Sequence, residues 1–170
     1  MRWIVLLVCV ALSSTASAQT GPTHPWSRGT TLEGFIGMAT HPTTTGSYGG
    51  AVGWELTQRF EIQGLGAWFP HTGTDEFAAD LKVLMNLIRP TTLVPYVTGG
   101  AGLYQGTFDR AKSETDPTAI VGGGAHLYLR RHFSIRPEAA ARFVIDRTRV
   151  YRVATVTFAL TYHFEEHGPN

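Results

Sequence analysis

The chain has 170 residues, with 14 Lys+Arg against 13 Asp+Glu, one Cys, 19 Gly and 43% hydrophobic residues. The near-zero net charge excludes the basic surface of a nucleic-acid-binding protein, and the apolar content excludes an intrinsically disordered chain. A single Cys excludes a disulfide framework. The composition leaves one modest domain, which we take to be either a soluble all-β domain or a β-barrel in a membrane.

The first residues have the three parts of a secretory signal peptide. Arg2 gives a positive start, residues 3–12 form an apolar run, and Ala16-Ser17-Ala18 is a small-residue cleavage site. The run is too short for a spanning helix, which needs about 20 residues. We predict that residues 1–18 are removed, together with the only Cys, and that residues 19–30 form a polar lead.

The rest of the chain repeats a period-two alternation of apolar and polar residues, which is typical of β-strands. The alternation predicts an all-β domain over residues 31–164, with a C-terminal tail at 165–170. Most segments are near ten residues long, which exceeds the usual five or six and matches the roughly 9 to 11 tilted residues that cross a bilayer. The eight predicted strands are 31–40, 47–56, 59–69, 77–88, 93–104, 118–130, 132–143 and 153–164.

The last of these strands shows the alternation most clearly. Its apolar face holds Ala154, Val156, Phe158, Leu160, Tyr162 and Phe164, and its more polar face holds Thr155, Thr157, Ala159, Thr161 and His163. One face suits lipid and the other suits a polar barrel interior. A soluble sandwich with its apolar face turned inward would give the same pattern.

The expected connections alternate in length along the chain. Those after the second, fourth and sixth strands are short, at 57–58, 89–92 and near 131, whereas the others are longer, at 41–46, 70–76, 105–117 and 144–152. Tight turns at one end and longer loops at the other are typical of an up-and-down outer-membrane barrel. The pattern favours an eight-stranded antiparallel transmembrane barrel over a Greek-key sandwich.

Several charged residues fall on the more polar face of their strands. In a barrel they would point into the lumen, where acids and bases can pair, whereas a charge on the lipid side costs roughly 2 to 4 kcal/mol at the midplane. Eight strands enclose a space that side chains can fill, so we expect no open channel. The expected lumen network comprises Glu33, Glu55, Glu61, Lys82, Arg136, Glu138 and Arg142.

Aromatic residues gather near the ends of the predicted strands. This distribution is typical of the two aromatic girdles at the membrane interfaces. The girdle residues would be Trp54, Phe60, Tyr162 and Phe164 toward the tight turns, and Trp68, Phe69, Phe77 and Tyr104 toward the longer loops.

Three stretches resemble strands of the small eight-stranded outer-membrane β-barrel proteins of the OmpA/OmpX type: 94–103, then 122–129 followed by 133–138 and 142–143, and 157–164. The resemblance implies an outer-membrane protein made by barrel-insertion machinery. It also implies a terminal insertion signal formed by Thr157, Ala159, Tyr162 and Phe164. Two departures are Ala159, where that signal usually has Gly, and the residues that follow Phe164.

Candidate catalytic residues fail a distance test. His132, Ser134 and Glu138 share one face, and some barrels resembling this one are lipid A deacylases with an H-x-S pair. However, Glu138 would lie about 20 Å along the strand from His132, too far to orient it. His163 and His167 would lie roughly 13 Å apart on an extended chain, so we expect solvated imidazoles, no metal, no cofactor and no catalytic residue.

The sequence therefore predicts a monomeric outer-membrane barrel with a structural or surface-interaction role, whose loops near Thr43 and Lys112 face outward. Its expected partners are outer-membrane lipid, lipopolysaccharide and the insertion machinery, with no nucleic acid. Two alternatives are an outer-membrane lipid hydrolase of the lipid A deacylase type and a soluble periplasmic lipid-binding β domain.

Overall fold

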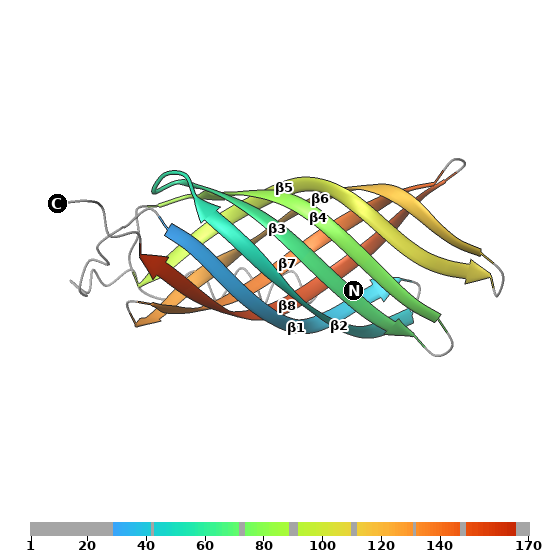
Figure 1. Ribbon diagram of the computed structural model, residues 1–170, viewed down its shortest axis with the longest axis horizontal. Coiled ribbons are helices and arrows are strands. Elements are labelled where there is room, and N and C mark those ends of the chain that lie inside the picture. Colours follow the sequence, from blue (N-terminus) through green and yellow to red (C-terminus); the bar gives the residue numbers. More distant parts are fainter. Residues whose placement is uncertain are drawn as a thin grey trace, which may run out of the picture.

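The computed structural model contains eight antiparallel strands that close into a barrel (Figure 1). It describes residues 29–41, 43–71, 74–88, 92–109, 112–130, 132–146 and 149–165. The strands are β1 (Gly29–His41), β2 (Thr43–Glu55), β3 (Phe60–His71), β4 (Thr74–Asn86), β5 (Leu93–Asp109), β6 (Lys112–Arg130), β7 (Phe133–Ile145) and β8 (Val150–Glu165). The predicted fold class is confirmed.

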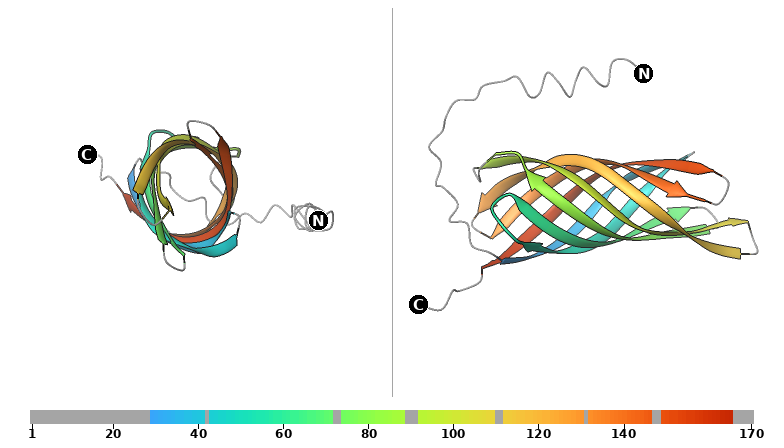
Figure 2. Two further views of the ribbon diagram at one scale, coloured as in Figure 1. Left: turned by 90° about the vertical axis from the view of Figure 1, so that its right-hand side faces the viewer. Right: turned by 90° about the horizontal axis from the view of Figure 1, so that it is seen from above.

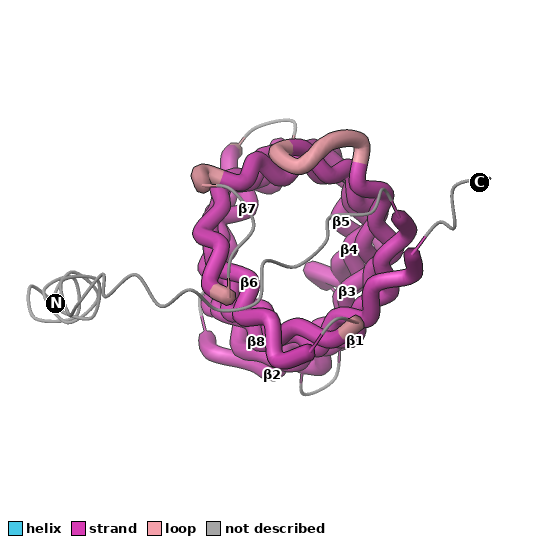
Figure 3. The backbone as a smooth tube through the Cα atoms, turned by 90° about the vertical axis from the view of Figure 1, so that its left-hand side faces the viewer, coloured by secondary structure: helices cyan, strands magenta, loops and turns pink. Residues whose placement is uncertain are grey.

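Closure comes from pairing between the first strand and the last. β1 pairs with β2 on one side and with β8 on the other, in a register that runs from Gly29 opposite Glu165 to Thr40 opposite Ala154. Seen along its axis, the sheet is an unbroken ring (Figures 2 and 3). Because each strand has two neighbours, the sheet has no edge.

The barrel has two distinct ends. β1 begins and β8 ends at the same end, which we call the terminal end; the β1–β2, β3–β4, β5–β6 and β7–β8 hairpins turn at the other, which we call the hairpin end (Figure 1). The β5–β6 hairpin reaches furthest there. Within the described ranges, no helix is long and apolar enough to span a membrane.

The two faces of the sheet differ as the alternation predicts. On β8, Val156, Phe158 and Leu160 are more than half exposed on the outside, whereas Ala159 and Thr161 are buried inside. β4 repeats this alternation of exposed outer side chains and buried inner side chains. The outside is therefore apolar and the inside is mixed, the reverse of a soluble barrel.

The expected difference between long and short connections is wrong. At the hairpin end, β1 ends at His41 and β2 begins at Thr43. The other strands at that end also continue into residues where loops were predicted. The ladder continues because neighbouring strands still pair there, as Gln105 does with Thr115. The alternation fades at the hairpin end because side chains on both faces become polar. The sequence pattern therefore underestimates the length of the strands.

One connection at the terminal end is a hydrogen-bonded turn. The backbone N–H groups of Leu56 and Thr57 donate to the carbonyl of Phe60. Thr57 Oγ1 accepts from the N–H groups of Arg59 and Phe60, at 3.1 and 3.0 Å. The predicted signal peptide, nearly all of the lead and the tail after Glu165 lie outside the described residues.

Glycines on the inner face make room for large neighbours. A Cβ added at Gly102 would collide with the carbonyl of Ala79 and with the Asp80 carboxylate. By contrast, a Cβ at Gly66, on the outer face, would meet nothing within 4 Å. Glycine at position 102 is therefore a packing requirement, whereas at 66 it is not.

Replacing these two glycines by alanine is expected to give different stabilities. Gly102→Ala overpacks the lumen and should lower the free energy of unfolding by about 1 to 3 kcal/mol. Gly66→Ala adds an unhindered methyl group and should change it by less than about 1 kcal/mol. Urea unfolding of the refolded protein, followed by tryptophan fluorescence, measures both. Equal losses in the two variants would contradict this account of the inner face.

Candidate functional site

Charged side chains from opposite walls meet across the lumen. Arg136 on β7, only 2% exposed, donates through Nη2 to Glu33 Oε1 on β1 at 2.6 Å and to Gln63 Oε1 on β3 at 3.0 Å. Thr161 Oγ1 on β8 donates to the second carboxylate oxygen of Glu33 at 3.1 Å. These contacts tie four strands together through Arg136 and Glu33.

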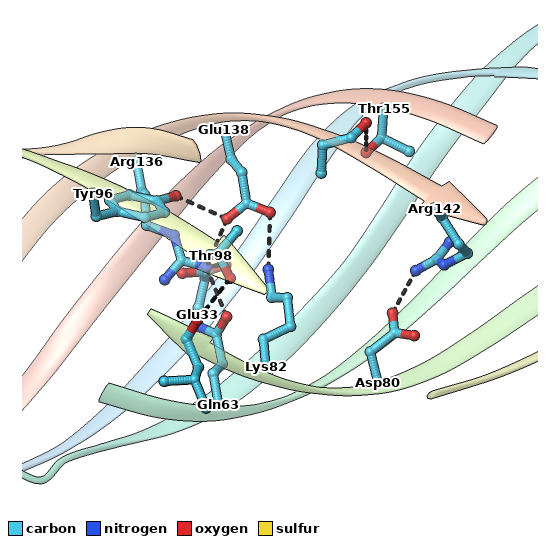
Figure 4. Close-up of polar contacts among 12 residues, drawn as sticks. Glu33, Gln63, Asp80, Lys82, Tyr96, Thr98, Arg136, Glu138, Arg142 and Thr155 are labelled. Atoms are coloured by element: carbon cyan, nitrogen blue, oxygen red, sulfur yellow. Dashed lines mark hydrogen bonds and ion pairs between the residues drawn. The ribbon is translucent and has the colours of Figure 1, made fainter. Parts of the chain in front are cut away.

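Glu138 is the second junction of this network (Figure 4). It accepts hydrogen bonds from Lys82 Nζ on β4 at 2.9 Å and from the Tyr96 hydroxyl on β5 at 2.8 Å. Arg136 Nη2 lies 4.0 Å from Glu138 Oε2. Glu33, Arg136, Glu138 and Lys82 therefore form an alternating series of charges across the barrel, as buried charges require.

A separate ion pair lies closer to the hairpin end. Arg142 Nη2 donates to Asp80 Oδ2, which links β7 to β4 (Figure 4). The Arg142 guanidinium carbon lies 5.4 Å from the centre of the Phe69 ring and 5.8 Å from that of Tyr104. Thr118 Oγ1 donates to Asp80 Oδ1 at 3.4 Å.

The seven residues of the predicted network all face the lumen, but they do not form one cluster. Glu61 instead accepts from Thr31 Oγ1 at 2.9 Å, and Glu55 contacts His163. Sequence reasoning left out Asp80, Gln63 and Tyr96. Asp80 was detectable, because it shares the inner face of its strand with Lys82.

Apolar and aromatic side chains surround the Arg142–Asp80 ion pair in the hairpin half of the lumen. They form one buried cluster of Phe35, Ala39, Ala67, Phe69, Ala78, Tyr104, Val144, Val153 and Ala159, with Leu65 and Tyr151 packed against it. The prediction that Phe69 and Tyr104 belong to an outer girdle is wrong, because both are buried inside. Their inward position follows from strand parity, since their neighbours Trp68 and Leu103 are exposed outside.

A small cavity lies between the charged and apolar parts of the lumen. Its volume is about 40 Å³, and residues of both ion-pair groups line it, including Lys82, Arg136 and Arg142. In the described part of the chain, Nε and Nη1 of both arginines are buried without a hydrogen-bond partner. A cavity of this size fits ordered water, the usual partner of such donors.

At the terminal end, three inner side chains are connected in a line. Ser134 Oγ lies 2.9 Å from His163 Nε2, and His163 Nδ1 lies 3.3 Å from Glu55 Oε1. The expectation of a solvated His163 is wrong, since its ring is buried within the lumen. Within the described ranges, no cluster of three or more His, Cys, Asp or Glu side chains could hold a metal ion.

The tested set of His132, Ser134 and Glu138 does not come together. His132 Nδ1 contacts the backbone carbonyl of His163 at 3.1 Å, and Glu138 binds Lys82. Ser134 finds its imidazole on the neighbouring strand, which a search along one strand does not examine.

The residues of the predicted insertion signal lie on both faces of β8. Thr157 and Ala159 face inward, whereas Tyr162 and Phe164 face outward. The Tyr162 ring lies edge-on to Phe164 at 4.7 Å and to Phe133 at 5.0 Å between ring centres. These three rings form an outer aromatic cluster at the terminal end, and recognition by insertion machinery stays a prediction.

Removing the central guanidinium is expected to destabilise the barrel strongly. Arg136→Met leaves the Glu33 carboxylate buried without its cation, which costs about 3 to 5 kcal/mol. The matched control is the double variant Glu33→Gln/Arg136→Met, in which no charge is orphaned at Glu33, and it should recover part of the loss. Urea titrations of the wild type, both single variants and the double variant measure the coupling. A midpoint for Arg136→Met equal to that of the wild type would contradict the central role of Arg136.

Comparison with known proteins gives matches in structure alone. No protein-family model matches the chain, and no curated protein matches it in sequence. The N-terminal β-barrel domain of Pseudomonas aeruginosa OprF aligns with a TM-score of 0.65 at 16% identity, over 80% of this chain and 98% of that one. Neisserial surface protein A (NspA) aligns with a TM-score of 0.66 at 10% identity, over 79% and 96%.

A third match is Ail, the attachment invasion locus protein of Yersinia pestis, with a TM-score of 0.54 at 12% identity, over 81% of this chain and 99% of that one. At such identities the likeness concerns the fold and not the activity. Strand number, closure and apolar exterior agree with it. The chain has the fold of the small eight-stranded outer-membrane β-barrels, as the sequence resemblance implied.

Proposed function

We propose that this protein is an integral outer-membrane β-barrel with a side-chain-filled lumen and a structural or surface-interaction role. The observation that carries the proposal is the apolar exterior. Large apolar side chains are exposed around the described wall, among them Leu32, Ile36, Met38, Leu81, Leu103, Val121, Val156, Phe158 and Leu160. A soluble protein rarely exposes a continuous apolar surface of this kind, whereas lipid requires one.

The interior supports a structural role over a channel. The cluster around Phe69 and Tyr104 fills the hairpin half of the lumen, and the Arg136 network crosses the other half. Eight strands leave a lumen just wide enough to be filled in this way. The contacts with the surroundings then come from the hairpin end and the outer wall.

The hairpin end is the part of the barrel that we propose to face the cell exterior, with Thr43 and Lys112 beside its turns. The terminal end would face the periplasm, because the two longest strands, β5 and β6, meet in a hairpin at the other end, and outer-membrane barrels extend further on the cell exterior. The proposed partners are outer-membrane lipid and lipopolysaccharide along the wall, and the insertion machinery during biogenesis. We propose a monomer, because ring closure leaves no strand edge to pair with a second copy.

The two alternatives fit the geometry less well. A lipid A deacylase of the H-x-S type needs its nucleophile at the lipid surface, but Ser134 lies on the inner face and is fully buried. A soluble lipid-binding barrel would turn Phe158 and Leu160 toward its interior, and both are more than half exposed.

A charge on the outer wall distinguishes a membrane barrel from a soluble one. Phe158 lies near the middle of β8 and Phe164 near its terminal end. In lipid vesicles, Phe158→Arg should lower the free energy of unfolding by about 2 to 4 kcal/mol, because arginine at the bilayer midplane is poorly solvated. Phe164→Arg, close to the interface, should cost about 0 to 1 kcal/mol. Equal and negligible losses would indicate that the outer wall faces water.

Cysteine labelling in whole cells tests the proposed orientation. Thr43 at the hairpin end and Gln58 at the terminal end are both exposed, and the only natural Cys lies in the predicted signal peptide. A membrane-impermeant maleimide should label Thr43→Cys in intact cells, whereas Gln58→Cys should react only after the outer membrane is permeabilised. Labelling of Gln58→Cys alone in intact cells would reverse the orientation. Labelling of neither variant before permeabilisation would exclude surface exposure.

A further inference from the structure

We propose that Ser134 is a nucleophile that accepts the acyl group of a short-chain carboxylic ester entering the lumen at the terminal end, with His163 as its general base. This inference goes beyond the structural role proposed above and does not depend on it. It rests on the order of contacts among three inner side chains and on the donors beside them.

The contacts run in the order that activates a hydroxyl. Glu55 Oε1 lies 3.3 Å from His163 Nδ1, so the carboxylate favours the tautomer that carries its proton on Nδ1. That assignment leaves Nε2 as the acceptor for the Ser134 hydroxyl, which lies 2.9 Å away. A hydroxyl, an imidazole and a carboxylate linked in this order can act as nucleophile, base and orienting group on any fold.

Two adjacent strands, β7 and β8, and a third, β2, bring these residues to one level of the barrel. Ser134 is the second residue of β7, His163 lies two residues before the end of β8, and Glu55 is the last residue of β2. All three therefore lie at the terminal mouth of the lumen. The Glu55 side chain is the most exposed of the three at 18%, so the line of contacts runs from the mouth inward.

The imidazole is held in place by its surroundings. The backbone N–H of His163 donates to the carbonyl of His132 at 2.9 Å, and His132 Nδ1 contacts the carbonyl of His163 at 3.1 Å. The Tyr128 ring lies 5.3 Å from the His163 ring, between their centres. A base fixed in this way pays little ordering cost when it takes a proton.

Unpaired hydrogen-bond donors lie deeper in the lumen than Ser134, further from the terminal end. Arg136 follows Ser134 by two residues on the same inner face, and its Nε and Nη1 have no hydrogen-bond partner in the described part of the chain. The same holds for Nε2 of Gln63, whose Oε1 binds Arg136. Buried donors without an acceptor suit the negative oxygen that forms when an ester carbonyl is attacked.

Besides the ester, the proposed reaction consumes only water. The Ser134 oxygen forms a bond to the carbonyl carbon while its proton passes to His163 Nε2. The tetrahedral intermediate then breaks its bond to the alcohol oxygen, which takes the proton from His163 and leaves as the alcohol. Water, activated by the same imidazole, releases the carboxylic acid and restores the Ser134 hydroxyl.

The walls of the lumen set the class of ester. Ser134 points away from lipid, so an acyl chain embedded in the bilayer cannot reach it through the sheet. The apolar cluster around Phe69 closes the hairpin half of the lumen. The substrate must therefore be a small, water-soluble ester that arrives at the terminal mouth and displaces side chains there, because Ser134 itself is fully buried.

Labelling with diisopropyl fluorophosphate tests the nucleophile in the full chain, folded in detergent micelles. The Ser134 oxygen would form a bond to phosphorus, fluoride would leave, and the proton would pass to His163, giving a stable adduct that peptide mass spectrometry locates. Ser47 on β2 is an internal control, because it is also a buried, inner-face serine. We expect an adduct on Ser134 and none on Ser47.

Variants at three residues connect the labelling to the proposed roles. Ser134→Ala should abolish the adduct, and His163→Gln should slow its formation by about 100-fold or more, the usual effect of losing a general base. Glu55 is a positioning residue: Glu55→Gln should slow labelling, and Glu55→Asp should keep more of the rate. Unchanged heat-modifiable migration on a gel shows that each variant is folded.

An ester assay addresses the substrate class. The wild type should release nitrophenolate from p-nitrophenyl acetate faster than Ser134→Ala, and prior labelling should remove the difference. The proposal is overturned by any of four results: no adduct on Ser134, equal labelling of Ser47, a rate unchanged in folded His163→Gln, or no difference in nitrophenolate release. The comparison of Ser134 with Ser47 needs no variant, so it decides the question even where a substitution prevents folding.

Discussion

The pairing of β1 with β8 is the constraint on which the rest of the molecule depends. Once the ring is closed, backbone N–H and C=O groups along the wall are hydrogen-bonded to neighbouring strands, which hydrocarbon demands. Closure also fixes an inside and an outside. Each strand must then send alternate residues to the outer wall and into a narrow lumen, so Leu32 is exposed while its neighbour Glu33 is buried. The composition of both surfaces follows from that division.

A narrow lumen can hold charged residues only where they are paired and hydrogen-bonded. Every charge inside it has left water, a loss that pairing and hydrogen bonding must offset. Arg136 meets this demand by reaching Glu33 on another wall, and Lys82 meets it through Glu138. These ion pairs therefore link the walls of the barrel as well as neutralising the buried charges. Small inner residues complete the packing, since Gly53 leaves room for the hydrogen bond between Thr31 and Glu61.

Much of this arrangement follows from the alternation in the sequence, because parity decides which face a residue occupies. Parity predicted the inward direction of Arg136, Glu138 and Arg142 and the outward direction of Phe158. It does not predict the height of a residue in the barrel, which depends on the tilt and stagger of the strands. The error over Phe69 has a different cause, since its place near a strand end was read as a girdle position although parity puts its side chain inside the barrel.

The same limit explains why the contacts of Ser134 were missed. His163 is 29 residues away along the chain, and Glu55 lies 108 residues from His163. Inter-strand register brings the first pair together, and closure brings the second within reach across β1. A search along one strand tested Glu138 because it shares β7 with Ser134, but separation along an extended strand grows by about 3.3 Å per residue. Partners of an inner side chain lie on other strands at the same height.

The distribution of inner side chains makes the two ends of the barrel chemically different. Toward the hairpin end, Phe35, Phe69 and Tyr104 pack together and leave little for a solute to bind. Toward the terminal end, imidazole, hydroxyl and carboxylate groups are gathered within hydrogen-bond reach of one another. The packed side chains of the hairpin half stabilise the barrel and make it rigid. This stability allows the terminal half to hold buried polar groups in fixed directions, although their burial lowers the free energy of unfolding. Any chemistry inside this barrel therefore belongs to the terminal end, whereas the surface interaction that we propose belongs to the hairpins.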